Sequence, residues 1–410
     1  MSNRSLTSAL RSLGRCQGPS SRLIACHSRQ FSSSPAHGSS PSAPQRSSRF
    51  FADSPPTGVR AVFAETDNSD LNAILRTIQE KIILPAYLPE KQRKLVFDPK
   101  MRSYLEQNPV VIEVEGLEHK FSSIDRFKGI ENSKAILAKA LGNMHTSEDW
   151  TNLGTLLAGY KKAGIKLKPD HWGKVVRVAG SRGQIYAVIE CAKQSDKTGL
   201  LLTNRETVVR VLAYVNDKTA ANPGDVAEAR QALRWAEQVL DLLQRPEHML
   251  QTVRSRDRLH YSRVVRGMVL FARSSAVKAE QEAGESAEQD LSLLRDDVTL
   301  LESLWEGGAP QDLATLDEFA KLNPTPERSS GARVPQALNG SSYVQVLAQN
   351  IKGIQTTREL LGDEAKSLAP VEDALEKHLS EFVQTAPGRT KGWEDEYEKV
   401  VGKTPSWSSA

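Results

Sequence analysis

Apolar residues recur at three- and four-residue spacing along most of the chain after residue 132, which is typical of amphipathic helices. Glycines, prolines and polar cap residues divide this pattern into separate segments. The pattern predicts six helices in this part of the chain, over residues 133–141, 147–164, 169–183, 184–199, 204–217 and 225–243. Because the connections between them are short, neighbouring helices should pack antiparallel as hairpins.

Two stretches of this region, AGIKLKPDHWGKVV and TGLLLTNRETVVRV, keep step at an offset of 35 residues. Within these stretches Gly164 matches Gly199 and Val176 matches Val211. The helices before them match at the same offset, with the pairs Trp150 and Ile185, Leu153 and Val188, Leu156 and Cys191, and Leu157 and Ala192. One helix pair cannot bury both of its faces alone, so repeated pairs stack and share a continuous core. The sequence therefore predicts an all-α fold, a short α-solenoid of antiparallel helical hairpins with a C-terminal helical pair.

Regions outside the repeat are less regular. A helix is expected over residues 69–84, capped by Ser69 or Asp70, and residues 110–114 should form a short extended segment without a partner. Further helices are expected over 254–275, 286–308, 343–361 and 368–383. The predicted organisation is a transit peptide and disordered region at 1–52, a linker and N-terminal helical segment at 53–125, the helical-repeat domain at 126–276, acidic amphipathic helices at 277–322, a flexible loop at 323–341, a C-terminal hairpin at 342–401 and a disordered tail at 402–410.

The first 52 residues have no Asp, Glu or Lys, but they contain seven arginines among many serines. This composition is typical of a mitochondrial transit peptide and predicts the mitochondrial matrix as the location. Without the five arginines of residues 1–31, the 54 basic and 50 acidic residues of the chain nearly cancel. Cys191 would then be the one remaining cysteine, which leaves no internal disulfide and no thiolate metal site.

The segment GIKLKPDHW, at the junction of the two matched stretches, resembles the junction between repeats in the pentatricopeptide repeat family. The resemblance covers residues 133–245 and suggests a degenerate mitochondrial helical-repeat protein of fungal type. It implies an α-solenoid that binds single-stranded RNA in organellar transcript processing, stability or translation. Gly173 and Val208 stand where that family usually places base-reading side chains, so base-by-base readout is not expected.

Charge is unevenly distributed along the chain. Residues 118–218 hold 17 Lys and Arg against 10 Asp and Glu, whereas residues 280–321 hold 12 acidic residues and two basic ones. A stripe of arginines on the helix predicted over 254–275 could neutralise phosphates, or it could form salt bridges with the acidic region. The candidate RNA-binding residues are Lys174, Arg177, Arg182, Arg205, Arg210, Arg256, Arg263, Arg266 and Arg273.

No motif for catalysis, nucleotide binding, a cofactor or a metal was found, and the histidines are dispersed singly. No apolar run is long enough to suggest a membrane span. The leading hypothesis is therefore a non-catalytic, matrix RNA- or ribonucleoprotein-binding protein of organellar gene expression, with mitochondrial RNA or the mitochondrial ribosome as partner. The alternative is a scaffold that binds proteins, such as a respiratory-complex assembly factor or a mitochondrial ribosome subunit.

Overall fold

The computed structural model describes residues 60–125, 132–250, 254, 257–305, 312–322, 338–386 and 390–409. The predicted transit peptide, most of the predicted flexible loop and Arg256 lie outside these residues. Most of these residues are helical, and the described part of the chain contains one two-stranded sheet. The all-α prediction is confirmed.

The N-terminal part begins with α1 (Ser69–Ile78), which continues into η1 (Gln79–Ile83), one turn of π-helix, and η2 (Leu84–Tyr87). Asn68, one residue before the predicted caps, caps α1 by accepting a hydrogen bond from the amide of Leu71. The next elements along the chain are α2 (Glu90–Val96), η3 (Pro99–Met101), α3 (Arg102–Gln107), β1 (Val111–Val114) and β2 (Leu117–Lys120). They enclose a small second core built around Leu84, Val96 and Phe121.

The segment expected to be extended and unpaired is in fact one strand of a hairpin. β1 pairs antiparallel with β2, and Val111 lies opposite Lys120. The two strands are joined through Glu115 and Gly116, whose φ angles of 51° and 79° are both left-handed. This backbone matches the twist of a tight hairpin, which is why the sequence Glu-Gly turns the chain here.

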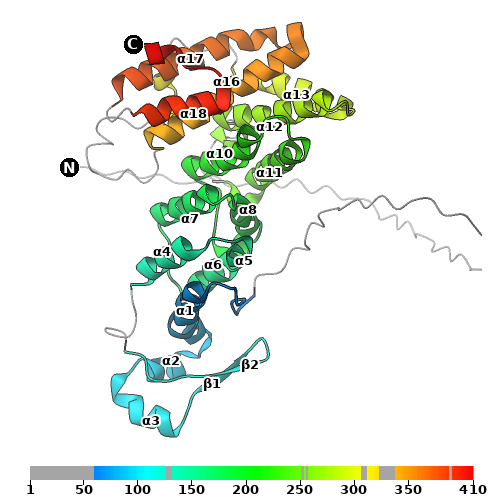
Figure 1. Ribbon diagram of the computed structural model, residues 1–410. Coiled ribbons are helices and arrows are strands. Elements are labelled where there is room, and N and C mark those ends of the chain that lie inside the picture. The colour runs from blue at the N-terminus through cyan, green and yellow to red at the C-terminus, as the bar shows by residue number, and fades with distance from the viewer. Residues whose placement is uncertain are drawn as a thin grey trace, which may run out of the picture. The chain divides into compact units, whose positions relative to one another are not determined.

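The middle of the chain contains α4 (Ser133–Asn143), α5 (Ser147–Thr151), α6 (Leu153–Lys162), α7 (Pro169–Ser181), α8 (Ile185–Lys193), α9 (Ser195–Thr198), α10 (Arg205–Ala221) and α11 (Val226–Gln244). Two of the six predicted helices are thus divided, one into α5 and α6 and one into α8 and α9. Helices α1, α4, α7 and α10 pack in sequence along one row, and α6, α8 and α11 pack along a second (Figure 1). This arrangement is the stacking of hairpins that the repeat predicts.

The two matched units agree in detail. Gly164 and Gly199 both end a helix with a left-handed backbone, at φ 72° and 77°, a conformation that glycine adopts without strain. The aligned apolar positions are buried in both units: Trp150 and Ile185, Leu153 and Val188, Leu156 and Cys191, Leu157 and Ala192, and Val176 and Val211. Positions 35 residues apart in the two units are therefore alike both in burial and in the way the helix ends.

Helix α12 (Arg263–Glu282) lies at the centre of the C-terminal half and packs against α10, α11, α13 (Glu288–Leu304) and α16 (Gly340–Leu361). It begins at Arg263, capped by Ser262, which is later than predicted. The two helices come close at Gly353 of α16, where an added Cβ would lie 2.8 Å from the backbone nitrogen of Phe271. Only glycine allows the two helix backbones to come this near.

The C-terminal pair is α16 and α17 (Ala369–Thr385), as the apolar pattern predicts, but a further helix, α18 (Lys391–Val401), packs on α16. Trp393 of α18 stacks on Phe382 of α17 with ring centroids 5.4 Å apart. The predicted disordered tail is wrong for residues 406–409, which form the turn η9 and bury Trp407. The other short elements are η4 (Pro246–His248), η6 (Leu259–Tyr261), η7 (Leu313–Thr315), α14 (Asp317–Leu322) and η8 (Gly362–Leu368).

Candidate nucleic-acid interface

Arg273, on α12, is buried and surrounded by carboxylates. Its guanidinium lies 2.8 Å from Glu237, 3.1 Å from Asp290 and 2.7 Å from Asp297. Burial alone would lower the pKa of Arg273, but the charges and hydrogen bonds of Asp297 and Glu237 raise it above its usual value. The side chain is 6% exposed, so its charge is used inside the fold.

The other described members of the arginine stripe are also engaged. Arg266 Nε donates to the carbonyl of His260 at 2.6 Å, and its guanidinium lies 3.9 Å from Asp297. Arg263 Nε donates to the carbonyl of Leu304 at 2.8 Å, and its guanidinium lies over the ring of Trp305. Arg263 also lies 3.8 Å from Glu318, so the alternative of salt bridges to the acidic region holds for Arg263, Arg266 and Arg273. These three side chains are therefore engaged within the fold rather than free for phosphate contacts.

Two candidates at the start of α10 are turned inward as well. Arg210 is buried, pairs with Glu206 one turn earlier, and donates to Ser342 Oγ of α16 at 3.0 Å. Arg205 lies 3.7 Å from Asp317 of α14. Both arginines connect α10 to later elements of the chain, so their first role is to hold helices together.

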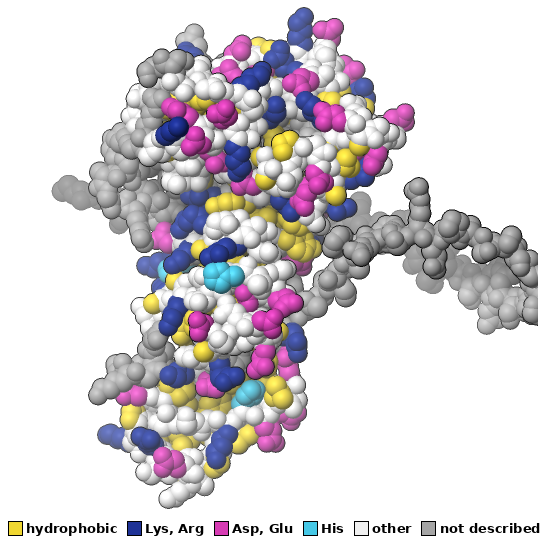
Figure 2. Space-filling model, viewed as in Figure 1, with side chains coloured by type: hydrophobic (Ala, Val, Ile, Leu, Met, Phe, Trp, Pro, Cys, Tyr) yellow, Lys and Arg dark blue, Asp and Glu magenta, His cyan; other side chains and the backbone are white. Residues whose placement is uncertain are grey.

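Helix α7 differs, because Lys174 and Arg177 are exposed on it and Arg182 is exposed at its C-terminal cap. We call these three residues the α7 face. Lys174 and Arg182 form no ion pair with any residue that the structure describes. Figure 2 shows Lys and Arg side chains along the side of the view on which Figure 1 draws α4 and α7. Cations without an internal partner remain available to neutralise phosphates.

Arg177 extends over Gly173, where an added Cβ would lie 3.1 Å from Arg177 Nη1 and 3.8 Å from each carboxylate oxygen of Glu206. Desolvation, and after it the charge of Arg210, lowers the pKa of Arg177 below its usual value. The Glu206 carboxylate therefore lies near two guanidinium groups, those of Arg177 and Arg210, and the charge of Asp170 also acts on Arg177. Gly173 and Val208 are both buried, which agrees with the expectation that neither position reads a base.

A second basic surface was missed by the sequence analysis. A hollow of about 530 Å³ at the end of α6 is lined by four basic residues, Arg60, Lys161, Lys162 and Lys197, by two acidic ones, Glu115 and Asp196, and by Tyr87, which is 38% exposed. The basic residues outnumber the acidic ones, and Glu115 lies 3.9 Å from Arg60. The ammonium group of Lys162 lies 5.2 Å from the centroid of the Tyr87 ring. We call the four basic residues and Tyr87 the lysine hollow. Lys162 and Lys197 occupy matching positions of the two repeat units, a signal that could have identified them.

Among the described residues, no cluster of His, Cys, Asp or Glu is arranged to hold a metal ion. In the same part of the chain, no helix has the length and apolar character needed to cross a bilayer. The geometry thus offers a helical body with two exposed basic surfaces.

A family model for mitochondrial ribosomal protein mS27 matches residues 49–400. The chain belongs to the mS27 family of mitochondrial ribosomal proteins. It is also 29% identical to the small ribosomal subunit protein mS27 of Neurospora crassa over 271 residues, which cover 63% of this chain and 67% of the relative.

Membership in the mS27 family confirms two predictions made from the sequence, the mitochondrial matrix as location and the mitochondrial ribosome as partner. A ribosomal protein family is also consistent with the prediction of a non-catalytic protein. Of the two functional hypotheses, the alternative that included a ribosome subunit fits the family better than the leading hypothesis of an RNA- or ribonucleoprotein-binding protein of organellar gene expression.

Proposed function

We propose that the chain is a structural protein of the small subunit of the mitochondrial ribosome, and that its α7 face and lysine hollow contact ribosomal RNA. The family supports a place in the mitochondrial ribosome, and the name of the Neurospora relative supports the small subunit in particular. The observation that carries the RNA contact is the exposure of Lys174 and Arg182 without ion pairs to described residues, in contrast to the arginines of α12.

Contacts made by these surfaces should go mainly to phosphates. Lysine and arginine on a helix surface neutralise the backbone and fix orientation, but they do not by themselves read sequence. The buried Gly173 and Val208 leave no base-reading group at the two positions where a pentatricopeptide repeat would have one. We propose that the two matched units are degenerate repeats of that kind, which position RNA without reading it.

The lysine hollow adds an aromatic surface to its charges. Tyr87 could stack on an unpaired base while Lys162 and Lys197 hold the flanking phosphates, a combination common in proteins that bind single strands. An RNA loop is the form of ribosomal RNA that fits such a site.

The test is to separate mitochondrial ribosomal subunits from cells carrying the tagged chain on a sucrose gradient. We expect the chain to sediment with the small subunit, and the double reversal Lys174→Glu and Arg182→Glu to shift most of it to the top of the gradient. Lys366→Glu changes an exposed charge on η8 and serves as the control, which should sediment normally. A wild-type chain that sediments apart from ribosomal subunits contradicts the proposal.

A further inference from the structure

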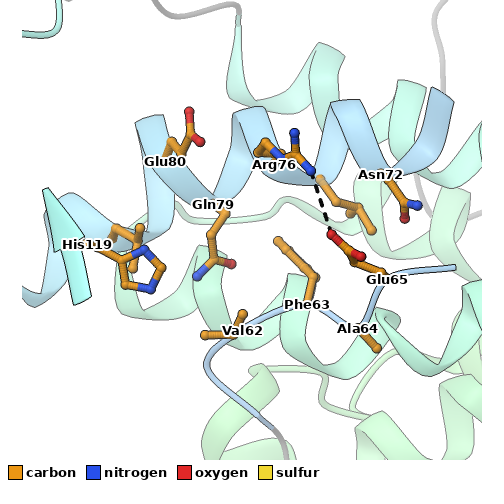
Figure 3. Close-up of a pocket in the computed structure, with 11 residues that line it drawn as sticks. Val62, Phe63, Ala64, Glu65, Asn72, Arg76, Gln79, Glu80 and His119 are labelled. Carbon is orange, nitrogen blue, oxygen red and sulfur yellow. Dashed lines mark ion pairs between the residues drawn. The ribbon is translucent and has the colours of Figure 1, made fainter. Parts of the chain in front are cut away.

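A cavity of about 260 Å³ lies between α1, the preceding segment and β2. Figure 3 shows Val62, Phe63 and Ala64 on one side, α1 on the other, and His119 of β2 at one end. Phe63 and Leu75 are among its apolar walls. The cavity is separate from the α7 face, and it shares no lining residue with the lysine hollow.

Gln79 supplies an unused hydrogen-bond acceptor to this cavity. The side chain is 6% exposed, and its Nε2 donates to the carbonyl of Ala61 at 3.1 Å. Because a carbonyl oxygen accepts only from the NH₂ group, this bond fixes the amide orientation and identifies the other atom as Oε1. That oxygen is buried and has no hydrogen-bond partner, and His119 Nε2 in the same cavity has none either.

Gln79 lies where the helix backbone changes. It is the first residue of η1, the single π-helical turn that continues α1. Single π-turns are common at functional sites. Figure 3 shows the Gln79 side chain directed from the helix toward the segment that carries Val62 and Phe63. A buried acceptor without a donor costs about 1–3 kcal/mol, so a ligand that donates to it gains affinity.

The charges at the cavity favour a cation. Arg76 lies 3.7 Å from Glu65, and both side chains are well exposed at the mouth. Glu80 also lines the cavity, and it forms no ion pair with a described residue. The remaining charge is therefore negative, which disfavours a nucleotide because its phosphate would lie beside carboxylates. A long side chain with an apolar stem and N–H donors at its tip matches the walls and the free acceptor.

We propose that this cavity receives an arginine side chain from a neighbouring protein of the assembly, with its stem against Phe63 and Leu75 and its guanidinium donating to Gln79 Oε1. This inference goes beyond the proposed function, because it assigns a protein contact to a surface other than the two basic ones.

Saturation-transfer NMR on the purified full chain tests it directly. The probe is N-acetyl-arginine methylamide, compared with N-acetyl-norleucine methylamide and adenosine monophosphate. We expect the arginine probe to bind best, and Gln79→Leu to weaken it about tenfold, the loss of a hydrogen bond to a charged group. Gln238→Leu removes another buried, unpaired amide oxygen far along the chain on α11 and should change nothing.

Glu80→Gln provides a second variant at an exposed position that does not threaten folding, and we expect it to weaken the arginine probe by a smaller factor. Equal binding of the arginine and norleucine probes would overturn the proposal, as would preferred binding of the nucleotide or no binding of any probe. None of these outcomes depends on RNA, so they leave the proposed function to its own test.

A photoreactive phenylalanine derivative in place of Arg76 tests the same site in the assembled small subunit. The expected product is a cross-link to a protein segment that contains arginine next to the linked residue. A cross-link to ribosomal RNA at this position would contradict the inference.

Discussion

Helices α7 and α12 both carry cationic side chains at helical spacing, yet the fold uses them in opposite ways. On α12, Arg266 and Arg273 lie against carboxylates of α13, and four helices cover the surface. On α7, Lys174 and Arg182 are exposed and unpaired among the described residues. The difference comes from the next helix in the chain, because the acidic α13 succeeds α12, whereas α8 after α7 has a single acidic residue, Glu190. A basic stripe indicates nucleic-acid binding only where no acidic element packs on it.

The largest effect is expected from Arg273→Met. The substitution leaves Glu237, Asp290 and Asp297 close together without their shared cation, and removing one partner of a buried ionic cluster costs about 3 kcal/mol or more. Urea unfolding at neutral pH measures the loss in the free energy of unfolding. Lys174→Met, the same change on the exposed helix, should alter it by less than about 0.5 kcal/mol. Similar losses for both variants would erase the contrast between the two helices.

Gly353→Ala tests how closely α16 packs on α12. The new Cβ would lie 2.8 Å from the backbone of Phe271, so the helices must separate, and we expect a loss of about 1–3 kcal/mol. Gly142→Ala is the control, since nothing lies within 4 Å of its added Cβ. In α4 this change should be neutral or stabilise by up to about 1 kcal/mol through higher helix propensity. A neutral Gly353→Ala in thermal unfolding would mean that α16 does not pack this closely on α12.

The α7 face is expected to contribute to RNA affinity. With the purified chain and a single-stranded RNA, Lys174→Glu and Arg182→Glu together should reduce affinity about tenfold at moderate salt. The slope of log affinity against log salt should fall by about 0.7 for each lost phosphate contact. Lys366→Glu should leave both quantities unchanged. An unchanged affinity in the double variant would remove α7 from the interface.

The smallest effect is expected on the pH dependence of stability, and it comes from the buried residue His378. Its ring nitrogen lies 2.7 Å from the hydroxyl of Tyr343. Burial lowers its pKa below the usual value of 6.5. The unfolded chain therefore takes up the proton first as pH falls, and stability declines below about pH 6.5 by at most about 1.4 kcal/mol per pH unit for this group.

His378→Gln keeps a hydrogen-bonding group near Tyr343 but removes the titration. The variant should show a shallower decline of unfolding free energy between about pH 6.5 and 5. Parallel pH profiles for the wild type and the His378 variant would contradict this assignment.

The repeat was predictable from the sequence because its signals are local. A glycine that ends a helix in the left-handed conformation, as at Gly164 and Gly199, and an apolar stripe are both properties of short segments. The same holds for α16 and α17. The matching burial of Leu156 and Cys191 follows once the offset is known.

The features that sequence analysis missed depend on distant residues. The hairpin of β1 and β2 is too short to show alternation, and its turn through Glu115 is a weak signal. The order of the tail depends on Trp407 packing near Tyr397, with ring centroids 4.8 Å apart. The pairing of Arg273 with α11 and α13, and the unpaired oxygen of Gln79, arise only in the packed structure.

The most direct test of the account is an electron cryomicroscopy map of the mitochondrial small subunit that contains this chain. We expect the α7 face to lie within hydrogen-bonding distance of ribosomal RNA phosphates, while Arg273 remains paired with Glu237, Asp290 and Asp297. A map in which Lys174 and Arg182 face solvent or protein, and RNA lies along α12 or α13 instead, would contradict it.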